Sequence, residues 1–150
     1  MPIKQTTPQQ QVDAYLDEQL RRMEKATLYN LAYVGERCIN IARSTTKAGK
    51  NYLDQTGNLR SSVGYILVQD GRIIQTSTFN SIKTGSEGSK EGKTFAQELA
   101  GKYNQGIVLL LVAGMSYAVH VQDKGYDVLT SAELLAENLA PKLLKQLGIL

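Results

Sequence analysis

The segment SSVGYILVQDGRIIQTSTF, residues 61–79, decides the fold class more than any other part of the sequence. Two runs rich in β-branched and aromatic residues flank the dipeptide Asp70-Gly71. This dipeptide favours a type I′ turn, because both central positions of that turn need a positive φ. We therefore predict a β-hairpin. Both faces of its first strand are apolar, so at least one face should pack against a helix.

A long amphipathic helix is predicted before the hairpin. Apolar residues recur at steps of three and four between residues 12 and 41, with Thr27 filling one gap. This pattern indicates a helix of roughly 30 residues and about 45 Å. Residues 1–10 contain two prolines and are interpreted as a flexible N-terminal arm. The apolar stripe consists of Val12, Leu16, Leu20, Met23, Leu31, Val34, Cys38 and Ile41.

The sequence after the hairpin predicts a loop, a strand and two further helices. Residues 80–93 are rich in Gly, Ser and Lys, which favours a long mobile loop, and Thr94 is expected to cap a short helix after it. The run IVLLLVA at 107–113 is typical of a central strand that is buried on both faces. A final amphipathic helix is predicted with Ser131 as its N-cap, and Pro141 should kink or divide it.

These elements predict an α+β fold. The N-terminal and C-terminal helices should pack on a small, mainly antiparallel sheet within a single domain over residues 11–150. A chain of 150 residues with 42% hydrophobic and 21% charged residues is typical of a globular domain. No secretory signal is visible, and the longest apolar run is too short to span a bilayer. We expect a protein of the cytoplasm without a membrane partner.

Little in the sequence indicates catalysis or metal binding. One cysteine and one histidine exclude an intramolecular disulfide and leave no Cys/His metal spacing, so we predict no metal and no cofactor. Cys38 lies on the apolar stripe and should be a buried, unreactive thiol. His120 is interpreted as a half-buried structural residue, because no nucleophile or carboxylate lies at a spacing typical of a general base. We therefore predict that the protein is not an enzyme.

Two compositional features leave alternatives open. GSKEGKT at 88–94 is similar to a P-loop, but only three residues separate Gly88 from Gly92, so we expect no nucleotide site. A net charge of +3 is a weak indication of nucleic-acid binding, which usually needs a denser basic surface. Eight tyrosines without tryptophan fit either a surface that packs against other proteins or residues that cover the core at strand ends.

The segment YLDQTGNLRSSVGY joins the long helix to the hairpin and is predicted to form a tight turn. Asp54 and Thr56 can accept hydrogen bonds from the backbone amides that follow them. Gly57 supplies the positive φ that a chain reversal needs. Leu59 should anchor the start of the first strand in the core, and Arg60 should point the opposite way because strand neighbours alternate faces.

This turn resembles a motif of the small head–tail connector (neck or tail-completion) proteins of tailed bacteriophages, where it follows the first helix. A second segment at the family spacing has the pattern Y-A-x-x-V-[EQ]-x-x-G. The common family form has Glu where this chain has Gln122, and more often an aromatic residue at position 120. The residues of the first motif are Asp54, Thr56, Gly57, Leu59, Arg60 and Ser62, and those of the second are Tyr117, Ala118, Val121, Gln122 and Gly125.

The resemblance implies a virion structural protein that has no catalytic activity and no cofactor. Such proteins assemble into a ring, commonly six-fold, between the portal-side connector of the head and the tail tube. The implied partners are other copies of the chain and the adjoining head and tail proteins, first in the host cytoplasm and then in the virion neck. Our candidate interface residues are Arg60, Lys83, Lys90 and Lys93. The alternative is a small cytoplasmic nucleic-acid-binding module that uses the basic loop and the basic end of the long helix.

Overall fold

The structure is a computed structural model, which describes residues 3–44, 57–81, 84–123 and 127–148. In chain order its elements are α1 (Gln9–Arg43), α2 (Asn58–Ser61), β1 (Val63–Gln69), β2 (Arg72–Thr76), α3 (Ser86–Ala100), β3 (Ile107–Ala113), α4 (Ala118–Asp123) and α5 (Thr130–Gln146).

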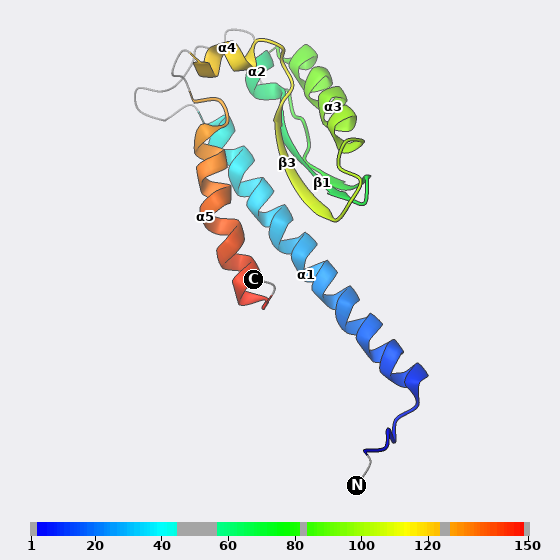
Figure 1. The fold of residues 1–150 in the computed structure, drawn as a ribbon. Coiled ribbons are helices and arrows are strands. Elements are labelled where there is room, and N and C mark those ends of the chain that lie inside the picture. The colour runs from blue at the N-terminus through cyan, green and yellow to red at the C-terminus, as the bar shows by residue number, and fades with distance from the viewer. Residues whose placement is uncertain (1–2, 45–56, 82–83, 124–126, 149–150) are drawn as a thin grey trace.

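The described elements form three layers, with an antiparallel sheet of order β2-β1-β3 in the middle (Figure 1). Alternate side chains of β1 point to opposite faces of the sheet. Val63, Tyr65 and Leu67 pack on α1 and α5, whereas Ile66 and Val68 pack on α3. The predicted α+β fold, with both terminal helices on a small antiparallel sheet, is confirmed.

The predicted hairpin is also confirmed. Asp70 has a φ of 51° and Gly71 a φ of 83°, as a type I′ turn requires. The Asp70 side chain also ties the turn to the start of β3. Its Oδ1 accepts a hydrogen bond of 2.9 Å from the Gly106 N–H, while its own N–H donates to the Gly106 carbonyl at 3.0 Å.

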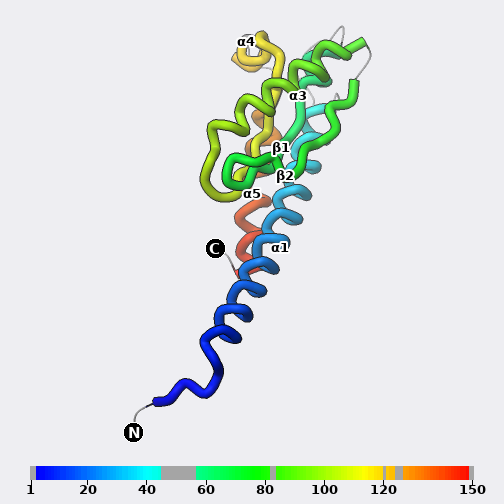
Figure 2. Tube along the Cα trace, turned by 90° about the vertical axis from the view of Figure 1, so that its right-hand side faces the viewer, coloured from blue at the N-terminus to red at the C-terminus, as the bar shows by residue number. Residues whose placement is uncertain are grey.

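The predicted long helix is present as α1, which has 35 residues. Only its C-terminal part, from Leu28 onward, contributes to the core against β1 and α5. The N-terminal part extends beyond the end of α5, away from the sheet, in both views (Figures 1 and 2). Residues 3–7 before it are exposed and belong to no helix or strand.

The prediction that residues 107–113 form the central strand is wrong. The central strand is β1, which is buried on both faces, and β3 lies at an edge with most of its side chains half-buried. Both runs are continuously apolar, so their composition does not distinguish the centre of a small sheet from its edge.

The prediction of a mobile loop over residues 80–93 is wrong from residue 86 onward, because residues 86–93 form the first half of α3. Thr94 therefore lies inside this helix and not at its N-cap. Its hydroxyl donates to the Lys90 carbonyl at 3.0 Å, a bond within the helix.

The C-terminal helix differs from its prediction at two points. It begins at Thr130 and not after Ser131, and Asp127 lies just ahead of it. Asp127 accepts a hydrogen bond of 3.1 Å from the Ser131 N–H and a second bond from the Ser131 hydroxyl. The helix also continues through Pro141 to Gln146 without a division.

Candidate assembly site

The two motifs that resemble the connector family are together called the signature, and the described residues of its first half, 57–62, include the short helix α2. Gly57 has the positive φ predicted for it, 79°, and Leu59 is buried as predicted, with only 2% of its surface exposed. Because residues 58–61 are helical, the expectation that strand alternation directs Arg60 outward is wrong; Arg60 is half-buried on α2. Asp54 and Thr56 lie outside the described residues.

Glycines of α3 allow this helix to lie directly on the backbone of the motif. A Cβ on Gly88 would lie 2.6 Å from the Asn58 Cα, and a Cβ on Gly92 would lie 2.8 Å from the Ser62 carbonyl carbon. The Gly88 N–H also donates to the Asn58 Oδ1 at 3.1 Å. These glycines permit close packing of α3 on α2, which explains why the glycine-rich segment is helical.

The serine of the motif stabilises the turn from within. The Ser62 hydroxyl is fully buried and donates to the Leu59 carbonyl at 2.6 Å. The Ser62 carbonyl in turn accepts a hydrogen bond of 3.2 Å from the Gly114 N–H. The motif is thereby joined to the residue that follows β3.

The two halves of the signature meet in one apolar cluster. Leu59, Ala118 and Val128 are its buried members, and Val121 packs against them. Tyr117, just before α4, is exposed, and Gly125 lies outside the described residues. Sequence reasoning supplied the order and spacing of the two motifs, but not this contact between them.

Gln122 ties α4 to the start of α5 through its side-chain oxygen. Its Oε1 accepts a hydrogen bond of 3.1 Å from the backbone N–H of Leu129, directly before α5. A glutamate would offer the same kind of acceptor oxygen. The contact that holds α4 against the start of α5 therefore needs an oxygen and not a negative charge.

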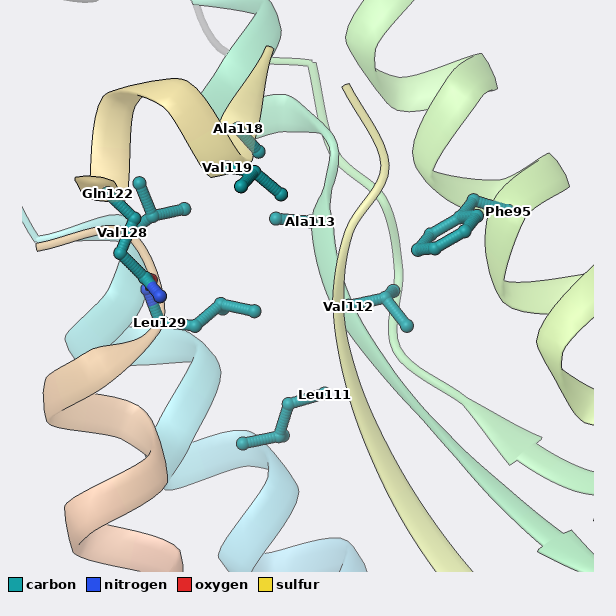
Figure 3. Close-up of a pocket in the computed structure, with 9 residues that line it drawn as sticks. All are labelled: Phe95, Leu111, Val112, Ala113, Ala118, Val119, Gln122, Val128 and Leu129. Carbon is teal, nitrogen blue, oxygen red and sulfur yellow. The ribbon is translucent and has the colours of Figure 1, made fainter. Parts of the chain in front are cut away.

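A small cleft of about 170 Å³ lies beside the cluster, at the C-terminal end of β3 (Figure 3). Of the described residues that line it, Gln122 is the one polar side chain. The cleft is therefore better suited to an apolar side chain of another molecule than to acid–base chemistry. Its other lining residues are Phe95, Leu111, Val112, Ala113, Ala118, Val119, Val128 and Leu129.

Among the described candidate interface residues, the two lysines of α3 lie on a surface of mixed charge. Lys90 and Lys93 are exposed on α3 and, at a spacing of three, share a face of the helix. Glu87 and Glu91 are exposed on the same helix, so the charge there is mixed. Lys83 lies outside the described residues.

The single cysteine lies where a thiol is poorly reactive. Cys38 is fully buried and its thiol donates to the Ala132 carbonyl at 3.2 Å. Burial raises the pKa of this thiol, although the nearby Arg37 opposes the shift. The buried position predicted for Cys38 is confirmed. The side chain of His120 lies outside what the structure describes.

Two further features are absent from the described residues. No set of three or more His, Cys, Asp and Glu residues there is arranged to hold a metal ion. None of the described helices is long and apolar enough to cross a membrane.

No family model matches the chain, and the comparisons with curated proteins and with solved structures found no match. The functional assignment therefore depends on the two-part signature and on the surfaces of the structure.

Proposed function

We propose that this chain is a virion structural protein of a tailed phage or prophage, which joins the head connector to the tail by assembling into a ring. The observation that carries the proposal is the contact between the two halves of the signature. Leu59 of the first motif packs with Ala118 and Val121 of the second in one cluster. Residues far apart in the sequence thus act as one structural unit, as expected if they form a single signature.

The distribution of apolar surface also supports a role in assembly. A ring subunit needs two different surfaces that fit each other, because each copy contacts one neighbour on each side. This chain exposes apolar residues on the projecting part of α1 and beside β3, two separate regions of the fold. A protein with this role functions through contacts and needs no catalytic group.

The proposal is tested by deleting the gene from the phage or prophage that carries it. We expect lysates that contain filled heads and separate tails but few joined particles, as counted by electron microscopy. Supplying the protein from a plasmid should restore joined, infectious particles. A normal yield of infectious particles from the deletion strain would contradict the proposal.

The alternative function, a small nucleic-acid-binding module, stays a prediction. Among the described residues it is favoured by the shared exposed face of Lys90 and Lys93, although Glu87 and Glu91 dilute the charge there. This alternative requires binding to nucleic acid that weakens steeply with salt, because phosphate contacts release counterions. A filter-binding titration at several salt concentrations distinguishes the two functions.

A further inference from the structure

We infer that the N-terminal half of α1, residues 9–25, of one copy packs antiparallel to α5 of a second copy, in the groove between α5 and β3. This inference rests on the ring assembly in the proposed function and identifies the two surfaces that form the contact.

The N-terminal half of α1 presents an apolar face that the described part of its own chain does not cover. Leu16 is 53% exposed, Leu20 58% and Met23 43%. These residues continue the stripe that is buried further along the same helix, where Leu31 and Val34 face the core. A face of this kind on a projecting helix is expected to pack against another molecule.

The groove lies between β3 and α5 and has a volume of about 250 Å³. Leu109, Leu111 and Ala136 form part of its apolar lining, and Glu133 and Glu137 of α5 also border it. An apolar groove bordered by carboxylates fits an amphipathic helix that carries basic residues beside its apolar face.

The outer edge of β3, on the side away from β1, also offers a place for a helix. None of the described strands pairs with this edge. The Asp70 N–H donates to Gly106 and the Gly114 N–H donates to Ser62, so the even-numbered residues of β3 direct their backbone groups toward β1. The N–H groups of Ile107 and of every second residue after it therefore point to the outer edge. Proteins commonly protect such an edge by covering it with a helix.

The charges of the two helices match only in the antiparallel orientation. In both, an acidic block precedes a basic block, and the block centres are about two helical turns apart. An antiparallel pair therefore places the acidic start of each helix at the level of the basic end of the other, and it sets the basic block of α1 near Glu133 and Glu137 at the groove. Within residues 9–25 of α1, Glu24 is the one residue that interrupts this order. The acidic blocks are Asp13, Asp17 and Glu18 in α1 and Glu133 and Glu137 in α5, and the basic blocks are Arg21, Arg22 and Lys25 in α1 and Lys142 and Lys145 in α5.

The ion pairs within α1 do not prevent its arginines from pairing with carboxylates of a neighbouring copy. Arg21 and Arg22 pair with Glu18 of the same helix at 2.9 Å and 3.4 Å. Both pairs are largely exposed, and exposed pairs contribute little to stability. The arginines can therefore move to carboxylates of a neighbouring copy at small cost.

Because the helix half and the groove are different surfaces, each copy carries one of each. Such a contact is heterologous, and it repeats from copy to copy until the ring closes. A mixing experiment with full-length chains distinguishes this arrangement from a symmetric dimer, in which the same surface is used twice.

The experiment uses one variant that lacks the helix surface and one that lacks the groove surface. The first is Leu16→Glu with Leu20→Glu, and the second is Glu133→Arg with Glu137→Arg. Analytical ultracentrifugation over a concentration series should show oligomers for the unmodified protein. Self-association of the helix variant should be at least about 100-fold weaker, because two leucines no longer become buried.

When the two variants are mixed, they should form a 1:1 complex and nothing larger. The intact helix of the groove variant enters the intact groove of the helix variant, and the remaining surfaces are both defective. Tyr15→Glu is the matched control, since Tyr15 is 65% exposed on the same helix but lies off the apolar stripe. Circular dichroism should show the same unfolding midpoint for all variants.

Three results would overturn the inference: an unmodified protein that stays monomeric at every concentration, a helix variant that assembles normally, or mixed variants that do not associate. The gene deletion keeps the two proposals apart. If the deletion blocks head–tail joining but the helix variant assembles and restores particles, the contact is wrong and the function stands. If the mixed variants associate but the deletion has no effect, the contact stands and the phage function is wrong.

Discussion

A single added methyl group at Gly88 should measurably destabilise the protein. A Cβ at this position would lie 2.6 Å from the Asn58 Cα, on the backbone of the signature turn. Since backbone cannot move aside as a side chain can, we expect Gly88→Ala to lower the free energy of unfolding by about 2–3 kcal/mol. Urea denaturation measures this loss.

Gly101→Ala is the control for this substitution. Gly101 lies at the end of the same helix with a φ of −66°, and the nearest atom to its Cβ would be 3.7 Å away. Alanine should be neutral or slightly stabilising there, because it restricts the unfolded chain. Equal stability of Gly88→Ala and Gly101→Ala would show that the helix does not rest on the turn.

Tyr65 should make the stability of the protein decrease at alkaline pH. Its fully buried ring lies against Gly35. Its hydroxyl donates to the Glu36 carboxylate and accepts from the Gln75 amide, each at 3.0 Å. Burial, followed by the hydrogen bond to Glu36 and the charge of Glu36, raises the pKa of Tyr65 to about 12.

Stability falls at high pH because the folded protein holds the Tyr65 proton more tightly than the unfolded chain does. An unfolded tyrosine has a pKa of about 10, so the folded protein keeps this proton longer than the unfolded chain does. The resulting stabilisation is complete below pH 10 and is lost as the pH rises toward 12, by about 2–3 kcal/mol. Tyr65→Phe has no hydroxyl to titrate, so its stability lacks this loss at high pH.

The measurement is chemical denaturation of the protein and of Tyr65→Phe between pH 8 and 12. We expect Tyr65→Phe to be less stable at pH 8, since Glu36 and Gln75 lose their shared partner. The difference between the two proteins should then shrink steadily above pH 10. Parallel pH curves would mean that the Tyr65 hydroxyl does not titrate with folding.

At the scale of elements, the sequence predicts well what local signals determine. The apolar period of α1 and the Asp70-Gly71 turn are each read within a short window, and the structure confirms both. The place of β3 in the sheet depends instead on which strands pair, and this is not a local property. An apolar run of seven residues fits an edge strand beside a groove as well as a central strand.

The glycine-rich segment shows a different limit. Glycine lowers helix propensity, so the sequence of residues 86–93 favours a loop. In the folded protein, Gly88 and Gly92 are the residues that let α3 approach α2, and tertiary packing outweighs the local cost. The spacing of four between these glycines is the signal that could have identified a helix face.

The candidate site was predicted in parts. Both motifs of the signature and the role of Gly57 came from the sequence, but the cluster that joins Leu59 to Ala118 depends on the fold of α4 beside α2. The acceptor role of Gln122 was missed, because its donor is a backbone N–H that no residue pattern specifies. The groove beside β3 requires the position of α5, which only the structure provides.

At the scale of the whole molecule, stability should be unevenly distributed along one continuous helix. The part of α1 from Leu28 onward is packed against the sheet and α5. The part from Gln9 to about residue 25 lies beyond them, with a largely exposed apolar face (Figure 2). An isolated helix of this length is only marginally stable in water, so this part should open locally while the core stays folded.

Hydrogen exchange measured by mass spectrometry tests this gradient. In dilute solution, amides of residues 29–42 should exchange only when the whole domain unfolds, and amides of residues 10–24 at least about 100-fold faster through local opening. At concentrations where the protein assembles, residues 10–24 should gain protection, while residues 29–42 should change little because they are already buried. Uniform protection along α1 in the monomer would mean that its N-terminal half is covered by its own chain, and it would then have no free face to offer a neighbouring copy.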